Sequence, residues 1–284
     1  MSDSATLTPA IAAFDAAAAS FDTRFGEWRS VAAQRRAVRR HLLAAFPPGA
    51  RLLELAGGTA EDALFLAAHG RHVLLTDGAP AMVARARAKA AGVFLPGNVD
   101  VGQLIIEEIE SFAEEWIRTD GPSFDGVYSN FAGLNCIADL QPVARGLARL
   151  LPEGAAALLV MFGPHPPGEA VVQLLRGDVR AAFRRTRRAA APARLGGRDF
   201  HVNYPRPAEV AAAFSPWFTL RCTRGIGVFV PPSAAEPLIS SLPRLLRCLE
   251  VIDRAATTPL ARFGDHVLLH FVRSGEPSPA GSPG

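Results

Sequence analysis

Short apolar runs alternate along the chain with longer stretches whose apolar positions repeat at helical spacing. The runs predict buried strands at 51–56, 72–77, 124–130 and 155–162, with a less regular candidate around 98–104. The stretches between them predict helices at 60–70, 79–92, 107–118 and 141–151. Strands that alternate with helices of this length form right-handed crossovers, so the pattern predicts an α/β fold built on a mostly parallel sheet.

This regular alternation covers only the middle of the chain. Two helices are expected before it, at 7–20 and 27–46, and an insertion follows Gly163. After the insertion the pattern predicts a short helix at 207–214, a strand at 218–230, a helix near 236–254 and a strand at 265–273. We expect N-terminal helices that act as a lid at 1–46, a ligand-binding core at 47–162 and a cap insertion at 163–205. The rest of the core follows at 206–274, where parts of 225–260 also contribute to the cap, and a disordered tail is expected at 275–284.

Composition narrows the class of protein. A chain of 284 residues with 49% apolar content can bury a full core, and its formal charge of +3 is a weak field for binding nucleic acid. Three cysteines without a Cys-x-x-Cys pair predict neither disulfides nor a metal site and favour a reducing compartment. Because no apolar run is long enough for a membrane span, we expect a cytoplasmic protein, monomeric or homodimeric.

The turn after the first strand is Ala56-Gly57-Gly58-Thr59-Ala60. It lacks the Gly-x-Gly-x-x-Gly pattern that lets a dinucleotide pyrophosphate approach a helix N-terminus. It also lacks the Gly-Lys-Ser/Thr of a nucleoside triphosphate loop, since Lys89, the only lysine, lies elsewhere. The turn therefore predicts neither of these phosphate-bearing ligands.

Carboxylates around this turn suggest a different ligand. Glu54 ends the first strand, and a buried ionised group needs a partner such as a ligand ammonium. Glu61 and Asp62 would also repel a pyrophosphate, although both equally suit the N-terminus of the next helix. Asp77 ends the second strand, where it can accept the two hydroxyls of a ribose or cap the helix that follows. A ribose and an ammonium without phosphates describe S-adenosylmethionine.

These segments resemble the class I S-adenosylmethionine-dependent methyltransferases. LLELAGGTAED resembles their first motif, LLTDGAPAMVARARAKA their second, and FDGVYSNFAGLNCIADL their strand-four region. The resemblance covers about residues 21–162 and implies a Rossmann-like seven-stranded sheet that ends in an antiparallel hairpin. It implies that the cofactor is held by these three segments and by a lid, at Phe21, Phe25, Glu54, Ala56, Gly57, Gly58, Asp77, Gly78, Met82, Asp100, Ser129, Asn130 and Phe131.

The chain departs from the family pattern at two places. Ala56 and Ala60 stand where glycine is commoner, and alanine adopts left-handed backbone angles with difficulty. We therefore expect Gly57 and Gly58 to take any unusual dihedral angles. The acidic residue that contacts the adenine after the third strand is also hard to place, and Asp100 is the first choice, with Gln103 behind it.

Before the sheet, SFDTRFGEW resembles the segment that folds over the cofactor in small-molecule members of the family. Phe21 and Phe25 are four residues apart and fit one apolar lid face, or a contact that seals the N-terminal helices to the core. The loop at 129–135 lacks the Asn/Asp-Pro-Pro-aromatic motif of members that methylate the amino groups of bases and glutamine. Small-molecule acceptors are therefore favoured.

Methyl transfer from a sulfonium needs alignment and desolvation rather than a covalent nucleophile. An oxygen or carbon acceptor would still gain from a base, for which His165 is the candidate. Asn135, His201 and Tyr204 are candidates for holding the substrate, although each residue also suits a surface or packing role. The expected function is therefore O-, N- or C-methylation of a small molecule.

An arginine-rich segment, FRRTRRAAAPARLGGR, holds six arginines in sixteen residues at 183–198. It predicts a solvated helix face that caps the active site, a grip on an anionic small substrate, or a phosphate patch for RNA. Two other functions therefore stay open: an RNA methyltransferase, and a protein that binds S-adenosylmethionine without transferring its methyl group.

Overall fold

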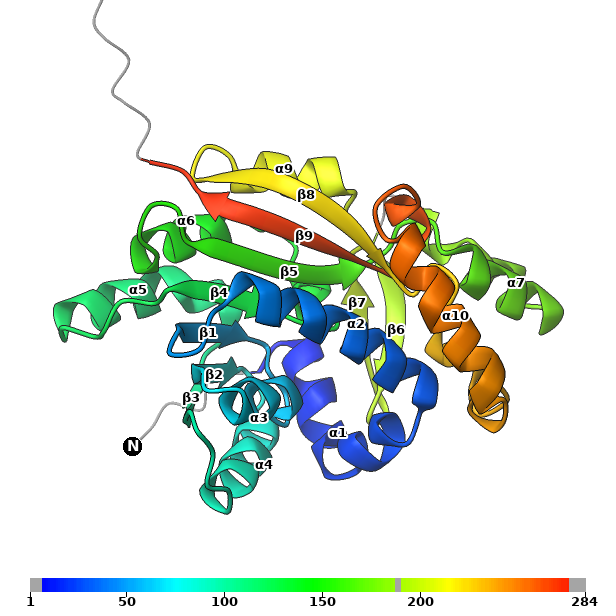
Figure 1. Cartoon of the computed structure of the whole chain (residues 1–284), viewed down its shortest axis with the longest axis horizontal. Helices are drawn as coiled ribbons and strands as arrows, with labels where there is room; N and C mark the ends of the chain where they lie inside the picture. The colour runs from blue at the N-terminus through cyan, green and yellow to red at the C-terminus, as the bar shows by residue number, and fades with distance from the viewer. Residues whose placement is uncertain (1–6, 187–189, 276–284) are drawn as a thin grey trace, which may run out of the picture.

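A seven-stranded sheet runs through the middle of the molecule (Figure 1), in a computed structural model that describes residues 7–186 and 190–275. The strand order is β3-β2-β1-β4-β5-β9-β8, in which β1 to β5 are parallel and β9 runs antiparallel to β5 and β8. The bounds are β1 Arg51–Leu55, β2 His72–Asp77, β3 Val99–Gln103, β4 Gly126–Ser129, β5 Ala156–Phe162, β8 Phe218–Ile226 and β9 His266–Arg273. This arrangement confirms the predicted Rossmann-like sheet with its terminal antiparallel hairpin.

Helices cover both faces of the sheet. Those on one face are α2 Arg29–Ala45, α3 Glu61–Ala68 and α4 Pro80–Ala91, and those on the other are α5 Ile109–Arg118, α6 Gln141–Leu150 and α9 Pro207–Phe214. Leu52 faces the first layer, whereas Leu53 and Leu55 face the second. A parallel strand covered on both faces reads as a continuous apolar run, which explains why RLLELA shows no alternation.

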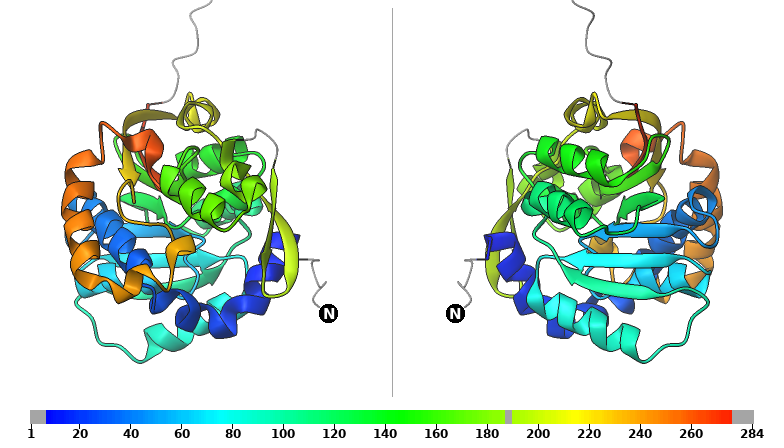
Figure 2. Two further views of the ribbon diagram at one scale, coloured as in Figure 1. Left: turned by 90° about the vertical axis from the view of Figure 1, so that its right-hand side faces the viewer. Right: turned by 90° about the vertical axis from the view of Figure 1, so that its left-hand side faces the viewer.

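The N-terminal helix and the insertion lie against each other. Helix α1, Pro9–Gly26, is longer than predicted, and the insertion contains α7 Pro167–Leu175, α8 Val179–Ala182 and a hairpin of β6 Ala191–Leu195 and β7 Arg198–Val202. Figure 2 shows this hairpin beside α1. The rings of Phe14 and Phe200 are 5.9 Å apart, and a Cβ atom on Gly196 would meet the Ala13 carbonyl oxygen at 2.8 Å.

Several predicted elements differ from those observed. The described part of 183–198 is a 3₁₀ turn and the β6–β7 hairpin, so the predicted helix face is wrong there, and residues 187–189 lie outside the described residues. The helix predicted near 236–254 is α10, Pro243–Ala256. Most of the predicted tail, 276–284, also lies outside the described residues. Within the described chain, no helix combines the length and the apolar character needed to cross a bilayer.

Candidate active site

The turn between β1 and α3 adopts an unexpected backbone. Ala56 and Ala60 take the left-handed region, with φ of 53° and 71°, together with Gly58 at 58°. Gly57 stays outside that region, so the expectation that Gly57 and Gly58 would take every unusual dihedral is wrong. Glycine is needed at position 57 for space, because a Cβ atom there would lie 2.5 Å from the Leu75 side chain and 2.8 Å from the carboxyl carbon of Glu54.

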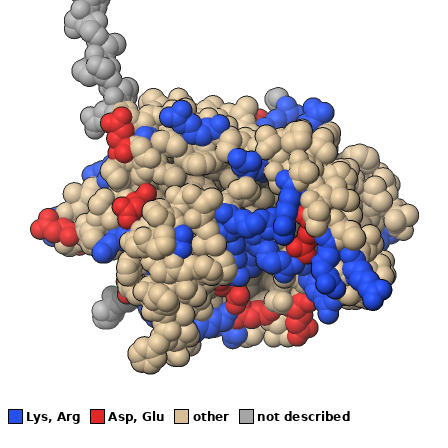
Figure 3. Space-filling view, viewed as in Figure 1, with Lys and Arg blue, Asp and Glu red and all other residues tan. Residues whose placement is uncertain are grey.

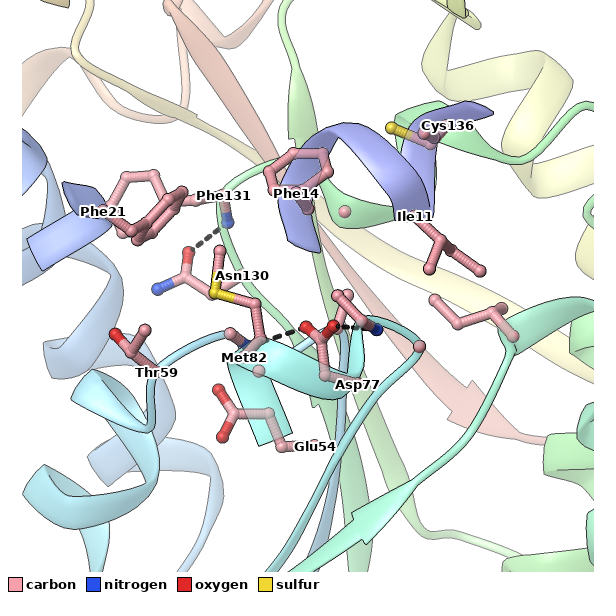
Figure 4. A pocket seen from close by; sticks show the side chains of 18 of the residues that line it. Ile11, Phe14, Phe21, Glu54, Thr59, Asp77, Met82, Asn130, Phe131 and Cys136 are labelled. Carbon is pink, nitrogen blue, oxygen red and sulfur yellow. Dashed lines mark hydrogen bonds between the residues drawn. The ribbon is translucent and has the colours of Figure 1, made fainter. Parts of the chain in front are cut away.

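Asp77 ties this turn to the end of β2. Its Oδ2 accepts the Gly58 amide at 2.9 Å and its Oδ1 accepts the Ala79 amide at 2.9 Å (Figure 4). Burial raises the pKa of Asp77 above its ordinary value despite these two donors. Each carboxylate oxygen has room for a further donor, so a role in holding the turn and a role in ligand binding are compatible.

Glu54 is a buried carboxyl group that forms no salt bridge within the described residues, although Arg35 lines the same pocket. Its side chain is 2% exposed, and its Oε2 has no hydrogen-bond partner among the described residues. Burial, and then the charge of nearby Asp62, raise the pKa of Glu54 well above its ordinary value. The carboxyl group is therefore a strained acceptor at the bottom of the pocket, as Figure 4 shows, and an ammonium would relieve the strain.

Asp62, in contrast, has its negative charge neutralised by two arginines of α2. Its two oxygens accept Arg35 at 2.6 Å and Arg39 at 2.7 Å, and the Asn130 amide donates to it at 2.7 Å. Basic side chains gather over the face that α2 covers (Figure 3), but these two arginines of α2 already bind a carboxylate. Glu61 pairs with Lys89 at 2.8 Å.

The turn, the strand ends and α1 enclose a cavity of about 140 Å³. Ten of the residues predicted to hold the cofactor line it: Phe21, Glu54, Ala56, Gly57, Gly58, Asp77, Gly78, Met82, Asn130 and Phe131. They come from α1, from the segments after β1 and β2 and from the loop after β4, so the fold brings together residues that are far apart in the sequence. The cavity lies at the carboxyl ends of parallel strands, where α/β sheets bind ligands.

Three other predicted residues do not line this cavity. Asp100 is opposite Leu74 near the amino end of β3, away from the carboxyl ends of the strands, and accepts a hydrogen bond from Asn98. Ser129 is completely buried in β4. The Phe25 ring packs at a tilt against Phe21, with ring centres 4.8 Å apart, and lines a neighbouring cavity instead.

Several residues that line the pocket were not predicted from the sequence. Ile106 and Glu107 line it just after β3, so Glu107 rather than Asp100 is the acidic residue at the expected place. Gln103 lies nearby and its amide donates to the Gly78 carbonyl at 3.4 Å. The apolar roof includes Ile11 and Phe14 of α1 and Cys136 of the loop after β4; the helical spacing of the two α1 residues was a usable signal.

The predicted substrate residues and the candidate base His165 lie in three different places. The Asn135 side chain is bound inside the protein, because its Oδ1 accepts the Phe162 amide at 3.0 Å and its Nδ2 donates to the Asn203 carbonyl at 2.5 Å. His201 is exposed on β7 and lines none of the cavities described here. Tyr204 and His165 line a second cavity of about 360 Å³, which shares Ile137 with the first.

An aromatic wall stands beside the cofactor pocket at the end of β5. The Phe162 ring stacks on His266 at 5.0 Å, and His266 meets the Phe131 ring edge-on at 5.4 Å. The His266 Nδ1 lies 3.0 Å from the Gln34 amide oxygen, which fixes the proton on that nitrogen. Burial lowers the pKa of His266 to about 4, so the ring is neutral at physiological pH.

A buried ionic network supports this wall and was not foreseen from the sequence. Arg185, from the arginine-rich segment, pairs with Asp265 at 2.9 Å and with Glu169 at 2.5 Å. Its guanidinium lies 4.6 Å from the centre of the Phe162 ring. Arg185 is therefore neither a solvated residue nor a free phosphate ligand.

Comparison with known families agrees with this geometry. Residues 52–154, which run from β1 past the end of α6, match the family model described as a methyltransferase domain. Residues 52–154 are therefore a methyltransferase domain, and the match supports the class I S-adenosylmethionine-dependent methyltransferase superfamily. The cofactor of this methyltransferase is S-adenosylmethionine. No curated protein matches the chain significantly.

Solved structures share the fold of this methyltransferase. DhpI in complex with S-adenosylhomocysteine superimposes with a TM-score of 0.56 at 16% identity, covering 95% of this chain and 97% of that one. A methyltransferase from Methanosarcina mazei gives 0.55 at 15% identity, covering 83% and 98%. A chain of the Haloferax volcanii complex between the Trm112 methyltransferase activator and a methyltransferase gives 0.51 at 19%, covering 92% and 98%. At these identities the likeness concerns the fold alone.

Proposed function

We propose that this enzyme methylates a small molecule inside a site closed by α1 and the β6–β7 hairpin. The observation that carries the proposal is the roof over the strand ends, where Ile11, Phe14 and Phe21 of α1 line the pocket. A cavity of about 140 Å³ is smaller than the roughly 300–1,000 Å³ of ordinary ligand sites. Helix α1 therefore has to move for the cofactor to enter, which fits a lid over a small acceptor better than an open groove for a polymer.

The residues of the pocket fit S-adenosylmethionine, since the unpartnered Oε2 of Glu54 needs a cation. Glu54 would accept the ammonium of the methionine part, Asp77 the ribose hydroxyls and Glu107 the amino group of the adenine. The complex of DhpI with S-adenosylhomocysteine supports the choice of ligand. When bound, the cofactor supplies a methyl group activated by a positive sulfur.

The chain contributes alignment and exclusion of water to the transfer. Phe131 lines the pocket beside Asn130, and its φ of 52° holds the ring between the cofactor pocket and His266. The aromatic rings of Phe131 and Phe162 would keep the reacting atoms dry. His165 remains the candidate base, acting from the second cavity on an acceptor that reaches across Ile137.

Calorimetric titration with S-adenosylmethionine tests the cofactor assignment. We expect Asp77→Ala to weaken binding by about tenfold to a hundredfold, or about 1.4–2.8 kcal/mol, because the ribose hydroxyls and the Gly58 amide lose their acceptor. Asp100→Ala is the matched control, since this carboxylate is exposed and outside the pocket. Equal affinities of the two variants would overturn the assignment.

RNA methylation and cofactor binding without catalysis are the competing functions. A methyltransferase in complex with the Trm112 activator is among the similar structures, so a macromolecular methyl acceptor is the alternative to a small molecule. RNA binding that falls steeply with salt would favour an RNA substrate. Cofactor binding with no turnover over a broad panel of acceptors would favour a protein without transferase activity. We place the enzyme in the cytoplasm, as a monomer or homodimer.

A further inference from the structure

Exposed apolar side chains gather in the stretch 167–183, which forms α7 and α8, and in the stretch 229–256, which ends with α10. Eleven of the fourteen large apolar side chains exposed in the described residues lie in these two stretches. The first carries Val171, Leu174, Leu175, Val179 and Phe183. The second carries Phe229, Leu238, Leu242, Leu245, Val251 and Ile252. Figure 1 shows α7 and α10 projecting together from the sheet, and we call the surface of these two stretches the α7–α10 face.

The apolar side chains of the α7–α10 face are contiguous. A groove of about 470 Å³ between α7 and the segment after β8 is lined by Val171, Phe229, Leu238, Leu242 and Leu245, and α8 packs on α7. Single exposed apolar residues are ordinary on protein surfaces, whereas a contiguous set rimmed by polar residues marks contact with a protein or a membrane. The face therefore indicates an apolar occupant.

Positive charges surround these apolar side chains. Five exposed arginines lie in the same stretches, each within one helical turn of an exposed apolar residue: Arg176, Arg180, Arg244, Arg247 and Arg254. Figure 3 shows basic side chains gathered over α10. An arginine side chain can bury its stem among apolar groups while its guanidinium reaches a polar layer.

The carboxylates of the two stretches do not balance these arginines. Three of them, Glu169, Glu236 and Asp253, are buried, and Glu250 forms an ion pair with α2 at 2.6 Å. Asp178 is the one exposed carboxylate of these stretches, all of whose residues the structure describes. The α7–α10 face therefore combines an apolar centre with a positive rim.

This charge distribution disfavours a second copy of the chain as the occupant. A two-fold interface brings the same patch of both subunits together, so the arginines of one copy would face those of the other. Like charges that face each other across an interface oppose association. An occupant that has an apolar layer and the opposite charge fits the face better.

We infer that the α7–α10 face binds the surface of a membrane that contains anionic lipids. Helices that lie on membranes insert apolar side chains at the boundary of head groups and acyl chains, while their arginines face the anionic head groups. Because α7 and α10 project from the body of the molecule, both helices can reach one flat surface (Figure 1). Membrane binding of this kind is independent of which acceptor is methylated.

Sedimentation with lipid vesicles tests the inference. We expect the full-length protein to bind vesicles of phosphatidylcholine and phosphatidylglycerol in equal amounts, to bind pure phosphatidylcholine far more weakly, and to dissociate as salt is added. Leu175→Asp should weaken binding to the mixed vesicles about tenfold or more, because it removes apolar contact and adds a charge of the same sign as the lipid. Arg247→Gln should weaken it about fivefold. Both side chains are exposed, so the variants should fold normally.

The matched controls are Phe94→Asp and Arg118→Gln, which make the same charge changes at exposed positions. Phe94 follows α4 and Arg118 ends α5, and Figure 1 shows both helices away from α7 and α10. Both control variants should bind the mixed vesicles as the wild type does.

Three results would overturn the inference. The first is equal binding of the mixed vesicles by Leu175→Asp and Phe94→Asp. The second is absence of wild-type binding to these vesicles; binding to polyglutamate instead would assign the face to an acidic protein. The third is a wild-type dimer that Leu175→Asp converts to a monomer in light scattering, which assigns the face to a second copy.

Discussion

Two regions of this methyltransferase bury carboxylates near the same edge of the sheet, and they treat them in opposite ways. At the end of β5, Asp265 is paired with Arg185. Burial alone would raise the pKa of Asp265, but the charge of Arg185 and the hydrogen bond from the Gln34 amide hold it below its ordinary value. At the end of β1, Glu54 forms no salt bridge within the described residues, and burial and the charge of Asp62 hold its pKa well above the ordinary value, although Tyr128 and Arg35 act in the opposite direction.

The presence or absence of a paired arginine distinguishes a structural carboxylate from one that is suited to bind a ligand. A buried charge that is neutralised within the protein contributes to the fold and offers nothing to a ligand. A buried carboxyl group with an unpartnered oxygen disfavours the folded state until a partner arrives. The cationic group of the cofactor can be that partner for Glu54, so its burial becomes a source of affinity.

Removing the positive charge of Arg185 should lower the free energy of unfolding more than any other change predicted here. Arg185→Met leaves Asp265 and Glu169 buried with too little positive charge, and we expect a loss of about 3–5 kcal/mol in the free energy of unfolding measured with urea. Arg194→Met is the control, because Arg194 and Asp199 are 70% and 76% exposed and 3.8 Å apart. A loss as small as that of the control would show that the network contributes little.

The unpaired region should respond in its ligand affinity. Glu54→Gln keeps the shape of the side chain but removes its charge, so S-adenosylmethionine should bind about tenfold to a hundredfold more weakly. Titrations in buffers of different ionisation enthalpy should show that the wild type releases protons on binding, because an ammonium favours the ionised form of Glu54. The variant should release fewer. Identical proton release in both proteins would contradict the pairing of Glu54 with the ammonium.

The same substitution should change how the stability of the free protein depends on pH. Because the folded-state pKa of Glu54 is raised, its contribution is most favourable below its ordinary value of 4.5 and is lost as pH rises toward the folded-state pKa. Glu54→Gln should therefore stabilise the free protein by about 1 kcal/mol at pH 8 and not near pH 5. Urea unfolding at both pH values measures the difference; a constant difference would refute it.

The smallest predicted effect concerns the backbone around the unpaired carboxylate. Ala56 has a φ of 53°, a region that costs alanine about 1–2 kcal/mol, whereas glycine loses more entropy on folding. Ala56→Gly should therefore stabilise the protein by a net of about 0.5 kcal/mol. Thermal unfolding, with Ala81→Gly in α4 as a destabilised control, would show the sign.

Much of the fold could be predicted because burial on both sheet faces leaves a plain pattern. The strand 72–77 and the helix 207–214 agree with the observed bounds of β2 and α9. The β6–β7 hairpin was missed because both strands are short and β6, Ala-Pro-Ala-Arg-Leu, contains no β-branched or aromatic residue. Its position depends on contacts with α1, which no local pattern encodes.

The residues of the candidate site could be predicted where they lie directly at the end of a predicted strand. Glu54, Gly58 and Asp77 lie at strand ends, so the topology brings them to one edge. Asp100 was misplaced because it lies inside β3 rather than after it, whereas Glu107, which lines the pocket, stood at the start of the helix expected at 107–118. The role of Arg185 was not predicted because its partners, Glu169 and Asp265, are 16 and 80 residues away in the sequence. In a segment rich in arginine, nothing in the sequence distinguishes the buried arginine from the exposed ones.

Gly196 lies where the hairpin packs on α1, the helix that roofs the cofactor pocket. It has a φ of +56°, and a methyl group there would meet the Ala13 carbonyl oxygen at 2.8 Å. Alanine at this position would push the tip of the hairpin away from α1 without altering any side chain of the cofactor pocket. A substitution at this one residue could thus change the rate at which reactants enter and products leave without changing the methyl-transfer step itself.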